Sequence, residues 1–146
     1  MKKLHMILTL TMILCFIFGC QDKQAMAELE AFRAQTIVEE QNEALFRKVI
    51  NELNKGNTEF FKELYAPDYG YYFPSNSQEP LSLEETQEMI NMHLISFPDY
   101  NWTIEEIFAV RDSIIARISN AGTFTEDYYG IPATGNKVES SAIFIV

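Results

Sequence analysis

The chain has 146 residues, of which 21 are acidic and 11 are basic, so its net charge at pH 7 is −10. A surface of that sign repels nucleic-acid phosphates and anionic lipid head groups, which argues against nucleic-acid partners and against membrane binding through a basic face. The length suits one domain of ordinary size with a single core.

The first twenty residues have the pattern of a bacterial lipoprotein signal peptide. Met1-Lys2-Lys3 is basic, the run from 4 to 18 is almost entirely apolar, and Gly19-Cys20 precedes a polar segment. That run is short for a transmembrane helix, which needs about 20 apolar residues. Because Gly-Cys after an apolar run resembles a lipobox, we expect cleavage before Cys20 and its lipidation, which places the protein outside the cytoplasm in the inner or outer membrane of the cell envelope. The alternatives are an ordinary signal peptide or an uncleaved anchor.

The cysteine count limits other chemistry. Cys15 would leave with the signal peptide, so the mature chain would keep only the lipidated Cys20, without a disulfide or a cysteine-based metal site. It would carry nine basic and 21 acidic residues, a net charge of −12.

Helical periodicity dominates the first half of the mature chain. Apolar residues recur every three or four positions over 25–53, which predicts a helix that is continuous or breaks near Glu39-Glu40. We expect residues 21–40 to be a linker or stalk helix and residues 41–146 to be the domain. A second short helix is expected from Asn57 or Thr58 to Tyr65, and a third from Ser82, where Glu85 completes a capping box, to Pro98.

Strand-like patterns fill most of the remainder. We expect a short aromatic strand over Tyr69–Phe73 and longer strands over 101–110, 114–121 and 137–146, with a turn at 111–113. Helices followed by an antiparallel meander indicate an α+β domain.

Several local sequences then carry a resemblance to a known family. They are NEAL at 42–45, YAPDY at 65–69, FPD at 97–99, WTIE at 102–105 and, above all, GTFTEDYYGIPATG at 122–135. Together they resemble the SnoaL-like polyketide cyclases and ester cyclases, from about residue 40 to residue 146. The resemblance implies an NTF2-like cone, in which three N-terminal helices pack into a curved antiparallel sheet around a cavity. It also implies a further C-terminal strand carrying a catalytic Asp, which this sequence lacks.

The resemblance implies an apolar cavity for a small molecule. We expect aromatic side chains to line it and to bind the ligand; the candidates are Phe46, Tyr65, Tyr69, Tyr71, Phe73, Phe97, Trp102, Phe124, Tyr128 and Tyr129. The loop 122–135 would close its rim, with three glycines and Pro132 shaping the backbone.

Acid/base catalysis is the chemistry that the family implies, yet key positions differ. Phe124 stands where family members commonly have a histidine, and phenylalanine cannot transfer a proton. His93 is the only histidine outside the signal peptide and is the candidate base. Asp99 and Asp112 suit turns, and Glu105-Glu106 would point to opposite faces of a strand unless a bulge intervenes. No metal-ligand or cofactor motif occurs.

Three functions therefore remain open. The domain is a cyclase acting on a small carbonyl compound, a non-catalytic carrier of an apolar molecule, or an assembly module that pairs as a homodimer through its sheet.

Overall fold

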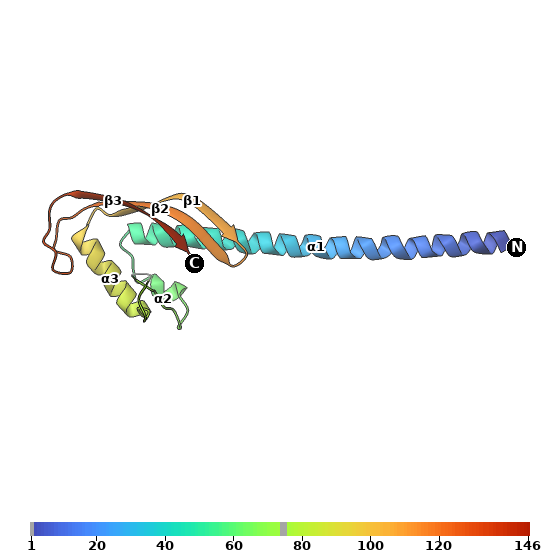
Figure 1. Cartoon of the computed structure of the whole chain (residues 1–146), viewed down its shortest axis with the longest axis horizontal. Helices are drawn as coiled ribbons and strands as arrows, with labels where there is room; N and C mark the ends of the chain where they lie inside the picture. Colours follow the sequence, from blue (N-terminus) through green and yellow to red (C-terminus); the bar gives the residue numbers. More distant parts are fainter. Residues whose placement is uncertain (1, 74–75) are drawn as a thin grey trace.

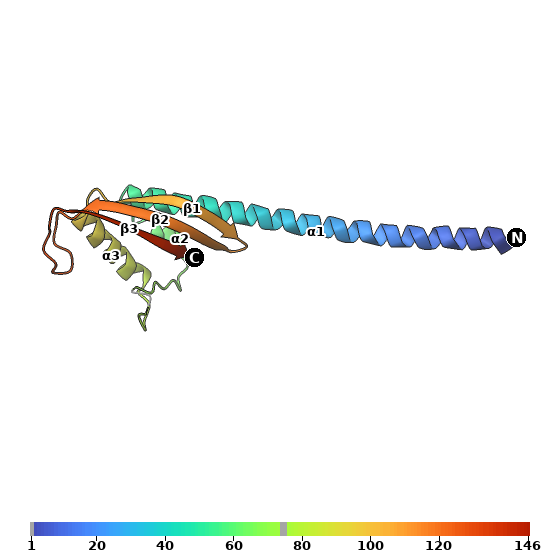
Figure 2. The same ribbon diagram turned by 45° about the horizontal axis from the view of Figure 1, so that its top comes forward.

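The computed structural model describes residues 2–73 and 76–146, with side chains described from residue 23 onward. Its longest element is α1, Lys2–Asn54, whose first part extends far beyond the rest of the molecule (Figures 1 and 2). The helix is continuous through Glu39-Glu40. It ends where Gly56 takes a positive φ of 72° and donates its amide to the carbonyl of Leu53. Within the described part of the chain, no helix is both long and apolar enough to cross a bilayer.

Two short helices follow. α2 spans Phe61–Leu64 and α3 spans Leu83–Ser96. The capping box of α3 is present as predicted, because Ser82 accepts from the Glu85 amide and Glu85 accepts from the Ser82 amide. α2 begins later than predicted, since the Thr58 hydroxyl donates to Asn91 Oδ1 at 2.7 Å instead of capping a helix.

The predicted strand at Tyr69–Phe73 is wrong. Only Tyr71 pairs there, through an isolated antiparallel bridge to Leu81. The segment therefore crosses to the start of α3 instead of joining the main sheet.

The main sheet has three antiparallel strands in the order β1-β2-β3. They are β1 (Asn101–Val110), β2 (Ser113–Thr123) and β3 (Lys137–Ile145), close to the predicted ranges. A bulge between Ile104 and Glu106 shifts the β1–β2 register, so Glu105 and Glu106 are both exposed.

The core lies between the sheet and the second half of α1. Phe46, Val49, Ile50 and Leu53 form one buried face of α1, and they pack on the inward residues of β2 and on Phe60 and Phe61; these β2 residues are Ile114, Ala116 and Ile118. Ala116 and Ile118 have no exposed surface. The helices α1 and α3 lie on the same face of the sheet, and the opposite face is open (Figures 1 and 2). The result is the α+β domain that the sequence predicts.

Candidate functional site

His93 lies in an aromatic cluster assembled from distant parts of the chain. It comes from the last turns of α3, and its ring centroid lies 4.7 Å from that of Phe97 at the end of the same helix. The ring of Tyr100, in the segment before β1, lies edge-to-face with the imidazole at a centroid distance of 4.3 Å, and the ring of Trp102 of β1 lies at 6.3 Å. Tyr128 adds a fourth ring at 5.6 Å, from the loop after β2. Four of the residues that the sequence singles out are therefore in one place: His93, Phe97, Trp102 and Tyr128.

Burial controls the charge of His93. The surrounding rings desolvate the imidazole and lower its pKa below the ordinary value of about 6.5. Burial is the only cause of this shift, and no carboxylate among the described residues contributes to it. His93 is therefore neutral at pH 7, which is the form that accepts a proton.

The loop 122–135 is anchored to the end of α3. Ser96 is fully buried; its hydroxyl donates to the carbonyl of Asp127 at 3.0 Å, and its carbonyl accepts from the amide of Thr125 at 3.0 Å. Phe124 stacks on Phe97 with a centroid distance of 5.0 Å. Phe124 is therefore buried against Phe97 and offers no titratable group.

The tip of this loop is a tight turn. Tyr128 and Ile131 exchange both backbone hydrogen bonds, and the two residues between them, Tyr129 and Gly130, have positive φ angles of 48° and 79°. That pair of angles is the type I′ geometry of two-residue hairpins. The turn directs Tyr128 toward His93 and leaves Tyr129 63% exposed.

The remaining tyrosines form a second cluster near the start of α3. Tyr65 lies 5.4 Å from Phe61 and 4.4 Å from Tyr69 between ring centroids, and Tyr71 stacks on Phe73 at 6.0 Å. Burial, with smaller contributions from the hydroxyls of Tyr69 and Tyr71, raises the pKa of Tyr65 to about 12. Burial also raises the pKa of Tyr69 and of Tyr71. The ten candidate aromatics thus fall into two clusters, apart from Phe46, which is a core residue packed against Phe144.

An open groove of about 420 Å³ runs along the flank of α3 between the two clusters. Two expected ligand-binding residues line it, Phe73 at the Tyr71 end and Tyr129 at the Tyr128 end. The other lining residues are Leu81, Glu85, Glu88, Met89 and Met92. The groove combines apolar walls with an acidic edge, and His93, although it follows Met92 in the sequence, is not among the residues that line it.

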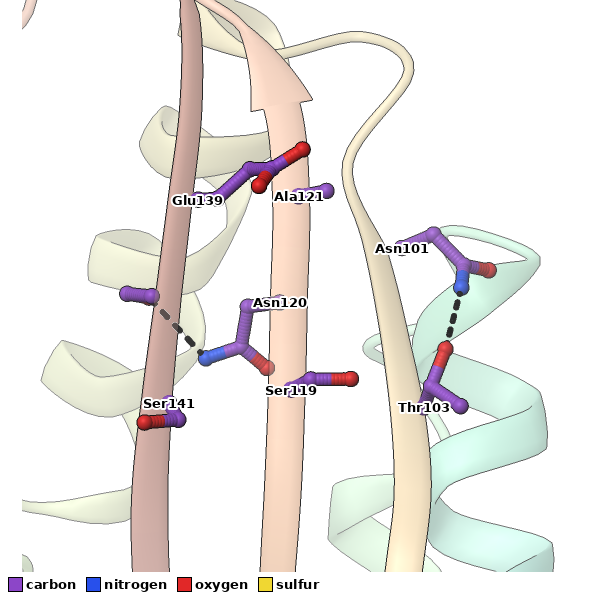
Figure 3. A pocket seen from close by; sticks show the side chains of 8 residues that line it. Asn101, Thr103, Ser119, Asn120, Ala121, Glu139 and Ser141 are labelled. Carbon is purple, nitrogen blue, oxygen red and sulfur yellow. Dashed lines mark hydrogen bonds between the residues drawn. The ribbon is translucent and has the colours of Figure 1, made fainter.

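A larger hollow of about 520 Å³ lies on the sheet and contains none of the candidate residues. It is lined by polar side chains of all three strands, among them Asn101, Thr103, Ser119 and Glu139 (Figure 3). Asn101 donates to Thr103, and Asn120 donates to Ser140. Because its lining is almost entirely polar, we place the candidate site at the aromatic cluster around His93 instead.

The acidic candidates have structural contacts. Asp99 accepts from the amide of Thr123 at 2.6 Å and from its hydroxyl at 2.7 Å, and these bonds lower the pKa of Asp99. Asp112 accepts from the hydroxyl of Ser113 in the β1–β2 turn. Glu105 pairs with Ser119, and Glu106 pairs with Arg117. Within the described ranges, no three His, Cys, Asp or Glu side chains come together as a metal site.

Sequence reasoning missed one residue of the site, Tyr100. Tyr100 is the ring closest to His93, and only its position between a proline turn and β1 could have indicated it.

Comparison with known proteins supports this architecture. Residues 43–146 match the family described as SnoaL-like polyketide cyclase. A proposed SnoaL-like polyketide cyclase from Jannaschia sp. CCS1 superposes with a TM-score of 0.65 at 19% identity, over 74% of this chain and 76% of that one. A proposed polyketide cyclase from Acidithiobacillus ferrooxidans gives 0.60 at 24% identity, over 71% and 76%.

A differently named protein has the same fold. AclR, a proposed hydroxylase from Streptomyces galilaeus, superposes with a TM-score of 0.62 at 21% identity, over 70% of this chain and 67% of that one. No curated protein matches. Identities this low show the fold, an NTF2-like one, and leave the chemistry to be argued from the site.

Proposed function

Because the chain belongs to the SnoaL-like polyketide cyclase family, we propose that it catalyses a cyclase-type reaction on a small apolar carbonyl compound, with His93 as the base. The observation that carries this proposal is the desolvated imidazole among aromatic rings. A neutral imidazole in an apolar setting is suited to remove a proton from a carbon next to a carbonyl.

The reaction balances without a further reactant. His93 takes the α-proton, and the resulting enolate carbon attacks a second carbonyl of the same molecule to close a ring. The new alkoxide then takes the proton back from the imidazolium. The product is an isomer of the substrate, and His93 returns to its neutral state.

The location belongs to the same proposal. Lipid on Cys20 would hold the protein on the extracytoplasmic side of a membrane of the bacterial cell envelope. Residues 21–40 would be the stalk; this stretch lies within α1, and several of its apolar side chains are exposed, including Leu29, Phe32 and Ile37. The side chain of Cys20 itself lies outside those the structure describes.

Non-catalytic binding of an apolar molecule is the alternative, and one observation favours it. Phe124 occupies the family's histidine position and stacks on Phe97, so His93 has no second imidazole beside it. Burial alone shifts its pKa, so among the described residues no carboxylate orients the ring for proton transfer. The same groove would then hold its ligand without chemistry.

Exchange of an α-proton distinguishes the two functions. The probe is 2-tetralone, an apolar bicyclic ketone, incubated in D₂O with the full chain in detergent; proton NMR measures the loss of its α-hydrogens. We expect the exchange catalysed by the wild type to fall by roughly 100-fold or more in His93→Gln. Ile95→Ala, at an exposed position of the same helix, is the matched control and should keep the wild-type rate.

The pH profile gives the second readout. Only the neutral imidazole accepts a proton, so the rate should rise with pH through the lowered pKa of His93 and level off above it. An exchange rate in His93→Gln equal to that of the wild type would contradict the proposal that His93 is the catalytic base. Non-catalytic binding would then be the function that the groove supports.

A further inference from the structure

The groove on the flank of α3 is a site of its own, separate from the cluster around His93. The helical residues that line it are Glu85, Glu88, Met89 and Met92, whose spacings of three, one and three place them on one stripe of the helix. His93 is not among the lining residues. The chemistry of the groove can therefore be read from its own side chains.

The walls of the groove are apolar and open to solvent. Phe73, Met92 and Tyr129 are all exposed, and Leu81 and Met89 are partly exposed. Large apolar side chains that gather on an exposed surface are typical of binding sites. The volume of about 420 Å³ falls in the range of small-molecule sites, and methionine side chains adapt readily to the shape of a ligand.

Two carboxylates face the same hollow. Glu85 Oε2 accepts from both the amide and the hydroxyl of Ser82 at 2.8 Å, and these bonds lower the pKa of Glu85, so this side chain stays ionised at neutral pH. Glu88 forms no ion pair with any residue that the structure describes. An apolar hollow thus carries negative charge that the ion pairs of the described residues leave uncompensated.

The surrounding sequence brings no positive charge to the groove. No lysine or arginine occurs between Lys62 and Arg111, or in the loop 122–135. All seven lining residues come from these two segments. An anionic ligand would therefore meet only repulsion from the side chains of these segments, whereas a cation would complement them.

We propose that the groove binds a small organic cation, an ammonium group carried on an apolar body. The ammonium group would lie against the carboxylates of Glu85 and Glu88, and the apolar body against the methionine side chains. The exposed rings of Phe73 and Tyr129 offer faces for a cation–π contact. This inference goes beyond the proposed function, because it holds whether or not His93 is a catalytic base.

Three probes of matched shape test the charge of the ligand: 4-phenylbutylammonium, 4-phenylbutanol and 4-phenylbutyrate. Equilibrium dialysis of the full chain in a non-ionic detergent measures binding, with detergent alone as the blank. We expect the wild type to bind the ammonium compound roughly fivefold to tenfold more tightly than the alcohol, and the carboxylate most weakly. The methyl NMR signals of Met89 and Met92 should shift when the ammonium compound is added, which locates the binding in the groove.

Charge removal tests the two carboxylates. Glu88→Gln should reduce the preference for the cation by roughly twofold to threefold, and Glu85→Gln with Glu88→Gln should abolish it, with the affinity for the alcohol unchanged. Glutamine at position 85 can still close the capping box, so α3 should keep its start. Glu84→Gln is the matched control, because it removes the same charge from an exposed position of α3 that does not line the groove, and it should keep the preference.

The proposal has clear contrary outcomes. A wild type that binds the alcohol or the carboxylate as tightly as the ammonium compound would overturn it, and so would a preference that survives in the double variant. A preference that falls as much in Glu84→Gln as in Glu88→Gln would also overturn it, because the general surface charge would then be its cause. None of these results bears on the exchange of 2-tetralone, so the proposed function stands or falls separately.

Discussion

Gly122 determines how closely Tyr100 approaches the sheet. A Cβ at position 122 would lie 2.6 Å from Cδ2 of the Tyr100 ring and 3.1 Å from its Cα. Real Cβ atoms do not come that close, so any side chain there would push Tyr100 away from its place against His93. The glycine of the Gly-Thr pair thus shapes the site through close packing.

Gly122→Ala should therefore both destabilise the fold and disturb the imidazole. We expect a loss of about 1–3 kcal/mol in the free energy of unfolding, as is typical of overpacking a close-packed site. Urea denaturation measures the loss, and the proton NMR shift of the His93 ring reports the displaced aromatic neighbour. Ala121→Ser adds one atom at the adjacent residue, on the other face of the sheet, and should leave both quantities near the wild-type values. Equal stability of the two variants would contradict the packing argument.

The sequence predicted His93 but only part of its surroundings. Helical spacing one turn before Phe97 places His93 correctly, because i and i+4 residues share a face. Tyr100 and Tyr128 reach it through long-range packing, which local patterns do not encode. The sequence also predicted that all the aromatic residues line a single cavity. In the structure, residues 65–73 run toward the start of α3, and this path separates the Tyr65 cluster from His93.

Element by element, strong local signals were reliable. The capping box begins α3 at the predicted residue, and alternation of apolar residues gives the three strands. The aromatic run 69–73 misled because residue types that favour strands form a strand only where a partner edge is available, and here only Tyr71 finds one. The bulge at Glu105 could be named as an alternative but not located, because it depends on pairing with β2.

The outer face of the sheet is not covered by another element of the described chain. We propose that a second copy of the chain covers it. Its end near the β1–β2 turn exposes large apolar side chains, with Phe108 60%, Ile143 69% and Ile145 75% exposed. A two-fold axis through this face would place each patch against itself. Contiguous apolar surface of this kind is typical of an interface.

Light scattering of the full chain, corrected for bound detergent, tests the pairing. We expect a dimer for the wild type and a monomer for Ile145→Lys, because the new charge would be buried against its own copy. Ile95→Lys is the matched control: it changes the same residue type at 66% exposure on α3, away from the sheet, and should remain dimeric. A monomeric wild type would refute the dimer directly.

At the scale of the whole molecule, α1 serves two roles along its length. Its second half carries the buried face that packs on the sheet, and its first half extends away from the domain (Figure 1). Glu39 accepts from the amide of Arg111, and Asn42 donates to the carbonyl of the same residue, at 2.8 and 3.3 Å. These bonds hold the turn between β1 and β2 against α1, at the point where the stalk meets the domain. Because the stalk separates Cys20 from the domain, a lipid at Cys20 would hold the groove at a distance from the membrane.

The two cysteines make the anchor testable within one chain. If Cys20 carries the lipid, Cys20→Ser should remove the acyl mass from the intact protein and release the protein's domain from the washed membrane pellet or block its processing. Cys15→Ser is the matched control, because it removes the other cysteine from the same apolar segment and should leave the lipid in place. Mass spectrometry of the protein extracted from its native membrane gives the answer directly. An acyl mass that persists in Cys20→Ser would place the lipid elsewhere, and an unmodified wild type would mean that the apolar segment itself, and not a lipid, must account for any membrane association.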